Sequence, residues 1–131
     1  YDVGDPLGIS FNRRSIYRTV VRSGRNSFLD AFDCPDPSTK TPKRAVTTTP
    51  LQALALLNSD LGLRLSDTFT TRLRHEAGPR ISDQVRLAFQ LCFARPPTLA
   101  ESRETQSFVS RHGLPALARV LFNSNEFLYV D

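Results

Sequence analysis

The chain has 131 residues, the size of one domain, of which 40% are hydrophobic and 23% charged, a composition typical of a globular protein. No apolar run approaches the roughly 20 residues of a membrane-spanning helix, so we expect no membrane insertion. The formal charge of +4 is modest and spread along the chain. Because nucleic-acid-binding proteins concentrate their basic residues in a stripe, we expect no nucleic-acid partner.

The first 49 residues are expected to form an extended, loop-rich arm. Residues 1–12 carry Gly4, Pro6 and Gly8, which favour irregular structure. Residues 13–22 are rich in β-branched and aromatic side chains, although some apolar residues there also have helical spacing. The periodicity does not decide between strand and helix, and the β-branched content favours an extended or strand-like segment.

A short helical turn is predicted at Phe28–Phe32, followed by a long loop. Pro35 and Pro37 remove backbone donors and bias the residues before them away from helix. The loop continues to Thr49 without a pattern of its own. Connections of this length are usually functional or held in place by side-chain contacts.

The stretch from Thr47 to Asn58 predicts a helix with a well-defined start. A threonine is a favourable N-cap, and Pro50 suits the first helical position because the N–H it lacks would be unpaired there. Leucines at helical spacing and the alanines between them leave little of this helix polar. Such a composition indicates a buried helix.

Four further helices are predicted towards the C-terminus. Asn58-Ser59-Asp60 carries helix-stop and helix-start chemistry, and leucines and a phenylalanine at four-residue spacing indicate a helix that follows from Leu61 and ends near residues 75–78. Pro79 opens a largely buried helix that stops at Arg95. Thr98 and Glu101 have the spacing of a capping box, which starts an outer helix that Gly113 ends. The apolar face of this helix is narrow and consists of Leu99, Phe108 and Val109. A last apolar helix, which we expect to be buried, covers residues 114–122, with a proline near its start like the helix at 47–58.

The predicted fold is therefore mainly α, a single compact bundle of about five helices with an irregular or strand-like N-terminal segment. We assign residues 1–131 to one domain, with the arm at 1–49 and the helical core at 50–131. The chain starts at Tyr1 and contains no methionine. We therefore expect it to be the C-terminal piece of a larger domain and protein.

A polar corner precedes the helix at 47–58 and is the best candidate for a ligand site. Hydroxyls and an arginine beside a helix start favour sulfate, phosphate or carboxylate. The simpler interpretation is structural: Thr49 caps the helix, and the aspartates pair with arginines to anchor the loop. The residues of this polar corner are Arg13, Arg14, Asp33, Asp36, Arg44, Thr47, Thr48, Thr49 and Gln52.

Signals for catalysis or metal binding are weak. His75 and His112 each fall at the end of a charged helix, outside any H-E-x-x-H motif, and the chain has no G-x-S-x-G elbow or glycine-rich phosphate loop. Cys34 and Cys92 lack C-x-x-C spacing. A disulfide between them is possible in an oxidising compartment, and two mostly buried free thiols are the favoured alternative. We expect no catalytic residue, metal or cofactor in this chain.

Four ordered stretches resemble a known family. They are RRSIY at 13–17, FDCPDP at 32–37, TTPLQALALLN at 48–58 and NSNEFLYVD at 123–131. Together they resemble the C-terminal part of a planctomycete-type domain of unknown function, family 1553. The stretch from Arg80 to Thr98, a helix followed by Arg95-Pro96-Pro97, also fits the pattern of this family.

The resemblance implies a domain context and a cellular location, but no reaction. Such domains lie downstream of cytochrome-c-like domains in large exported proteins, so haem c is expected in an upstream domain and the location is periplasmic, envelope or secreted. The leading hypothesis is an accessory or structural helical module that packs against upstream domains of its own polypeptide. The alternatives are a module that binds anions, such as sulfated or acidic polysaccharide, and a part of an oxidoreductase whose redox centre lies upstream.

Overall fold

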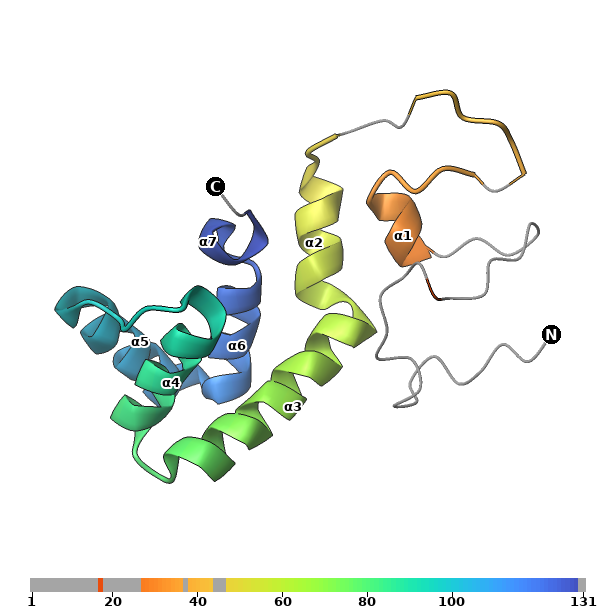
Figure 1. The fold of residues 1–131 in the computed structure, drawn as a ribbon. Coiled ribbons are helices and arrows are strands. Elements are labelled where there is room, and N and C mark those ends of the chain that lie inside the picture. The colour runs from red at the N-terminus through yellow and green to blue at the C-terminus, as the bar shows by residue number, and fades with distance from the viewer. Residues whose placement is uncertain (1–16, 18–26, 37, 44–46, 130–131) are drawn as a thin grey trace. The chain divides into compact units, whose positions relative to one another are not determined.

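The structure, a computed structural model, describes residues 17, 27–36, 38–43 and 47–129. These residues contain seven α-helices and no strand, so the chain is mainly α as predicted (Figure 1). The strand-like segment predicted at 13–22 lies outside the described residues, except for Tyr17. The helices are α1 Ser27–Ala31, α2 Pro50–Asn58, α3 Asp60–Ala77, α4 Ile81–Phe93, α5 Leu99–His112, α6 Leu114–Phe122 and α7 Asn125–Leu128.

The chain divides into two compact units, Tyr1–Ala55 and Leu56–Asp131, and the boundary falls inside α2. In the first unit, α1 is the short helical turn that the sequence predicts. The rings of Phe28 and Phe32 lie 5.1 Å apart. This aromatic pair therefore contributes apolar packing beside α1.

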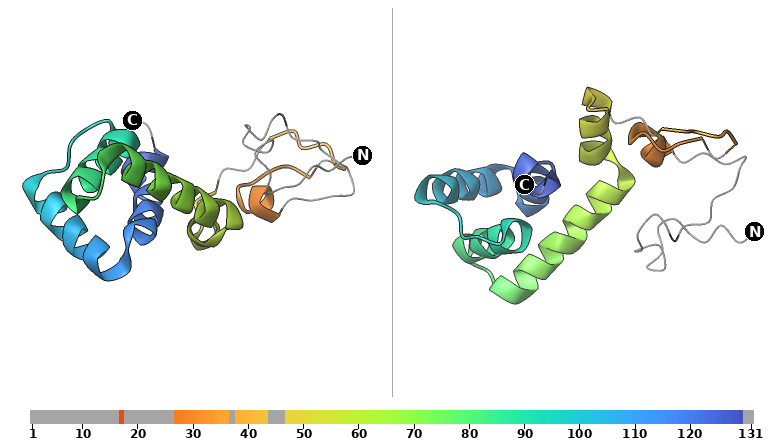
Figure 2. Two further views of the ribbon diagram at one scale, coloured as in Figure 1. Left: turned by 90° about the horizontal axis from the view of Figure 1, so that it is seen from below. Right: turned by 45° about the horizontal axis from the view of Figure 1, so that its top comes forward.

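The second unit is built on α3, α4, α5 and α6. The helix α3 packs against α4 and α6, and α5 also contacts both of them, so the four helices surround one core (Figure 2). The short helix α7, which the sequence did not predict, packs against α4 and α6. The buried apolar residues of this core are Leu73, Val85, Ala88, Phe89, Val109, Leu114, Leu117, Ala118 and Leu121.

Most helix ends follow the predicted capping chemistry. Ser59 caps α3 by accepting a hydrogen bond from the N–H of Gly62, and Thr98 and Glu101 form the predicted reciprocal capping box of α5. Gly113 ends α5 as predicted. The start of α4 differs, because this helix begins at Ile81, two residues after Pro79.

The corner between α2 and α3 is tight. A Cβ atom added to Gly62 would lie 2.6 Å from the carbonyl oxygen of Leu56, so the glycine allows the start of α3 to lie close to the backbone at Leu56. From α6, the Arg119 guanidinium donates to the carbonyl of Leu57 and to the Asn58 side chain, both at 3.2 Å. These bonds satisfy acceptors at the C-terminus of α2.

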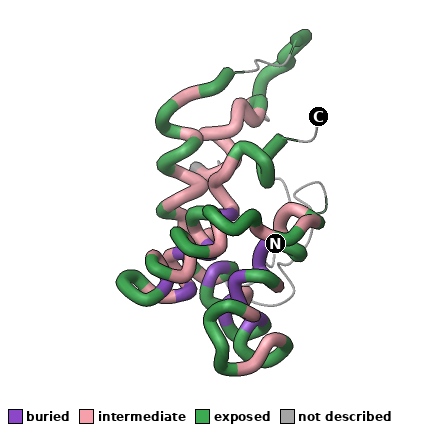
Figure 3. Tube along the Cα trace, turned by 90° about the vertical axis from the view of Figure 1, so that its left-hand side faces the viewer, coloured by how far each residue is buried: buried purple, intermediate pink, exposed green. Residues whose placement is uncertain are grey.

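The prediction that α2 is buried is wrong. None of its residues is buried, and the exposed fractions of Leu51 and Leu54 are 71% and 53%. In Figure 3 the buried colour is confined to the helices of the second unit. An apolar composition predicts that other parts of the protein pack over a helix. The sequence of the helix alone does not show whether such a packing partner is present.

The apolar helices after α2 match their predictions more closely. As expected, α6 is largely buried, and α5 has Val109 as its only buried residue and lies on the outside. Leu99, which we placed on the apolar face of α5, is instead 81% exposed. This leucine occupies the first position of the helix, where the stripe that faces the core has not yet begun.

Candidate functional site

At the start of α2, Thr49 and Gln52 bond each other reciprocally. The Thr49 hydroxyl accepts from the Gln52 N–H at 3.3 Å, and the Gln52 side-chain oxygen accepts from the Thr49 N–H at 3.1 Å. This is the arrangement of a capping box, here with glutamine at the third helical position. Two backbone donors at the helix start are therefore satisfied within the chain.

Asp33 extends this arrangement across the preceding loop. Its carboxylate accepts from the Thr47 N–H at 2.7 Å and from the Thr47 hydroxyl at 2.9 Å. The Gln52 side-chain N–H donates to the same hydroxyl at 3.1 Å. Asp33 itself adopts a left-handed backbone conformation, with φ 56°. These contacts join the two ends of a long loop and place a negative charge near a helix start, which the helix dipole favours.

The remaining residues of the polar corner are not all brought to this cluster. Asp36 accepts from the N–H and the hydroxyl of Ser38 at 2.8 and 2.6 Å, a local turn contact, and Thr48 is exposed. Arg13, Arg14 and Arg44 lie outside the described residues. The anion site thus stays a prediction. An anion at this corner would meet the carboxylate of Asp33.

A second polar cluster, which we call the Arg95 network, was missed by the sequence analysis. Two nitrogens of the Arg95 guanidinium donate to the two oxygens of Glu101 at 3.0 and 2.8 Å. Two donate to the oxygens of Glu126 in α7 at 2.7 and 2.8 Å. The guanidinium carbon also lies 5.7 and 5.6 Å from the ring centroids of Phe89 and Phe93. One side chain therefore joins the end of α4, the start of α5 and α7.

The Arg95 network perturbs the ionisation of its members. Hydrogen bonds from Arg95, and then from the Thr98 N–H, lower the pKa of Glu101 to about 2. The hydrogen bond from Arg95 also lowers the pKa of Glu126. The two carboxylates raise the pKa of Arg95, with the bond to Glu101 as the largest cause. All three groups stay charged at neutral pH, which favours a structural role over proton transfer.

The sequence signal for this network was weak. In the sequence, Arg95 belongs to the Arg-Pro-Pro segment that ends a helix, and Glu101 is the partner of Thr98 in the capping box. Glu126 lies 31 residues from Arg95, in a helix of four residues that the sequence did not predict. The bidentate match between a guanidinium and a carboxylate becomes visible only when the fold brings these segments together.

The histidines and cysteines form no metal centre in the part of the chain that the structure describes. The ring of His112 packs against that of Phe108, with centroids 4.7 Å apart. Cys34 and Cys92 are free thiols and half-buried. Burial raises the pKa of Cys92 to about 11, which makes it a poor nucleophile near neutral pH.

The fold and these clusters define a mainly helical protein with a four-helix core and an apolar helix, α2, at the boundary of two units. Residues 7–109 match the family model of PSD1, a protein of unknown function (DUF1553). The chain belongs to this family, as its sequence motifs predicted. No curated protein and no solved structure matches it. Among the described residues, no helix is both long and apolar enough to cross a membrane.

Proposed function

We propose that the chain is an accessory helical module that packs against the preceding part of its own polypeptide through the apolar side of α2. The observation that supports this function is the exposure of Leu51 and Leu54, at 71% and 53%. Both residues lie one turn apart on a helix that has no buried residue. Two neighbouring exposed leucines mark a surface that favours a covering partner.

The free energy gained by covering these two leucines is that of ordinary packing between protein domains. Fully burying a leucine side chain contributes about 1.5–3 kcal/mol, so covering both leucines stabilises an interface by a few kcal/mol at most. That amount suits contact between domains of one polypeptide, because linked domains do not lose the free energy of a bimolecular association.

The test compares two settings of the same helix. A double variant, Leu51→Glu with Leu54→Glu, is made in the 131-residue chain and in a longer polypeptide that includes the preceding domains. Leu99→Glu is the matched control, since Leu99 is 81% exposed and starts a different helix. We expect the double variant to lower the melting temperature and speed proteolysis only in the longer polypeptide.

The proposal fails if the double variant and the Leu99→Glu control melt alike in the longer polypeptide. It also fails if the double variant destabilises the 131-residue chain as much as it destabilises the longer one. In that case the two leucines support the fold of the chain itself.

A further inference from the structure

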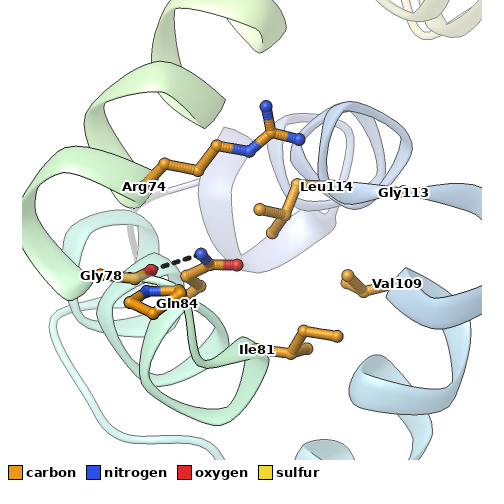
Figure 4. A pocket seen from close by; sticks show the side chains of 8 residues that line it. Arg74, Gly78, Ile81, Gln84, Val109, Gly113 and Leu114 are labelled. Atoms are coloured by element: carbon orange, nitrogen blue, oxygen red, sulfur yellow. Dashed lines mark hydrogen bonds between the residues drawn. The ribbon is translucent and has the colours of Figure 1, made fainter.

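A hollow of about 610 Å³ lies in the second unit where α3 ends and where α4 and α6 begin (Figure 4). Its volume is within the range of small-molecule sites. Most of its wall is apolar, and a few polar groups lie at its edge. The residues that line it are Arg74, Gly78, Pro79, Ile81, Gln84, Val109, Gly113 and Leu114.

Gln84 supplies a fixed hydrogen-bond acceptor to this hollow. The residue is only 4% exposed, and its amide nitrogen donates to the carbonyl oxygen of Gly78. Because a carbonyl only accepts, this bond sets which end of the amide is nitrogen. Figure 4 shows the amide oxygen on the opposite side, directed into the hollow towards Leu114 and Val109. A ligand with an N–H or O–H group would satisfy it.

Arg74 supplies a positive charge at the rim. It is exposed, and its guanidinium extends above Leu114 (Figure 4). Among the described residues it has no ion-pair partner, whereas Arg72 in the same helix pairs with Glu76 at 2.8 Å. The guanidinium is therefore available to bind a carboxylate in bidentate fashion.

The start of α6 adds to the attraction for an anion, whereas the first turn of α4 already carries the carboxylate of Asp83, which pairs with Arg80 at 2.8 Å. Neither α4 nor α6 has a side-chain N-cap bond, so N–H groups of their first turns lack that partner. Gly113, which precedes α6, has φ 84° and carries no side chain that could cover this end. The C-terminus of α3 carries a partial negative charge that would repel an anion. The Gly78 carbonyl at this end already accepts a hydrogen bond from Gln84.

We propose that this hollow binds a carboxylate that carries an apolar side chain and a neighbouring N–H group. In this arrangement Arg74 binds the carboxylate, the Gln84 oxygen accepts from the N–H, and Ile81, Val109 and Leu114 contact the apolar side chain. An N-acylated amino acid and the last residue of a peptide share this chemistry. The site is separate from α2, so its existence does not depend on the packing function proposed above.

The test uses NMR titration of the ¹⁵N-labelled 131-residue chain with N-acetyl-leucine and with the peptide Ala-Ala-Ala-Leu. We expect saturable shifts of the Gln84 side-chain amide and of the backbone amides of Gly78, Gly113 and Leu114. N-acetyl-leucinamide, which lacks the negative charge, should bind about tenfold more weakly, since a hydrogen bond to a charged group is worth about that factor. The analogue 4-methylpentanoate, which lacks the N–H, should bind about fivefold more weakly, because the bond it loses joins two neutral groups. The tighter of the two main probes identifies the free or the peptide-bound form as the ligand.

Substitutions of Arg74 and Gln84 test whether these two residues contact the ligand. Arg74→Gln should raise the Kd for N-acetyl-leucine about tenfold and leave the fold intact, because Arg74 is exposed. Arg103→Gln is the matched control, since Arg103 is an exposed arginine of α5 outside this hollow, and it should leave the Kd unchanged. Gln84→Met removes the acceptor and should also weaken binding, with its fold checked by circular dichroism.

The proposal is overturned if neither probe gives saturable shifts around the hollow. It is also overturned if Arg74→Gln binds N-acetyl-leucine as tightly as the unmodified chain does, whatever the outcome for Gln84→Met.

Discussion

Arg95 shows how one side chain determines the local arrangement of three helices. Its guanidinium bonds both oxygens of Glu101 and both oxygens of Glu126, and it lies over two phenylalanine rings at the end of α4. Partly exposed ion pairs are usually weak when they stand alone. The bidentate geometry and the shared arginine make this network more than an isolated surface pair.

The Arg95 network predicts an acid-dependent stability. The pKa of Glu101 is lowered in the folded chain from 4.5 to about 2, so its contribution is complete above pH 4.5 and is lost as pH falls towards 2. The pKa of Glu126 is shifted in the same direction. In Arg95→Gln, thermal melts at a series of pH values should show a flatter fall of the melting temperature over this window. Arg103→Gln should keep the original slope, and equal slopes for all three proteins would contradict this role.

The backbone conformation at the end of α3 requires glycine at position 78. Gly78 has φ 74° and ψ −160°, a region that is essentially restricted to glycine. A Cβ at this position would meet no atom within 4 Å, so any cost of Gly78→Ala comes from the backbone alone. We expect it to destabilise the chain by about 1–3 kcal/mol, measured by urea unfolding. A variant as stable as the parent would show that the glycine conformation is not required.

Ala94 provides the reverse case. It ends α4 in the left-handed conformation, with φ 55° and ψ 19°, where a side chain is unfavourable and glycine is common. Ala94→Gly should therefore stabilise the chain by about 0.5–1 kcal/mol, after the larger backbone entropy of glycine in the unfolded state is subtracted. Urea unfolding that shows a loss of stability instead would contradict this interpretation.

At the scale of elements, α2 and α6 have similar sequences and different surroundings. Each begins near a proline and contains alanines and leucines, and α2 ends at Asn58 while Asn123 follows the end of α6. Yet α6 has four buried residues and α2 has none. The sequence pattern therefore predicted both helices, but it could not show which one the rest of the chain covers.

A matched pair of leucines tests this difference. Leu121 in α6 is 4% exposed, so Leu121→Ala should cost about 2–5 kcal/mol. Leu51 in α2 is 71% exposed, so Leu51→Ala in the same 131-residue chain should change the stability by no more than about 0.5 kcal/mol. Both values come from denaturant unfolding, and similar losses for the two variants would contradict the assigned burial.

The other elements show what sequence could and could not predict. Local chemistry was sufficient for the Ser59 start of α3, the Thr98–Glu101 capping box and the Gly113 stop, because each signal lies within a few residues. Contacts between distant segments, such as Arg95 with Glu126, needed the fold. At the polar corner, residues 47–52 carried a recognisable helix start, but the role of Asp33 depends on a contact across 14 residues.

In the whole polypeptide, we propose that the apolar side of α2 is covered by the part that precedes this chain. Membership of the PSD1 family gives no activity against which to test it. Accessibility can be measured directly, because Leu51 and Leu99 are both strongly exposed in this chain, at 71% and 81%, and lie on different helices.

The most direct measurement is maleimide labelling of single cysteines. Leu51→Cys or Leu99→Cys is introduced into a chain whose native thiols are removed by Cys34→Ser and Cys92→Ala, both in the 131-residue form and in the longer polypeptide. Our account predicts that Leu51→Cys is labelled at least about tenfold more slowly in the longer polypeptide, as expected for a site that opens in a small fraction of molecules, while Leu99→Cys reacts alike in both. Equal labelling of Leu51→Cys in the two forms would contradict it.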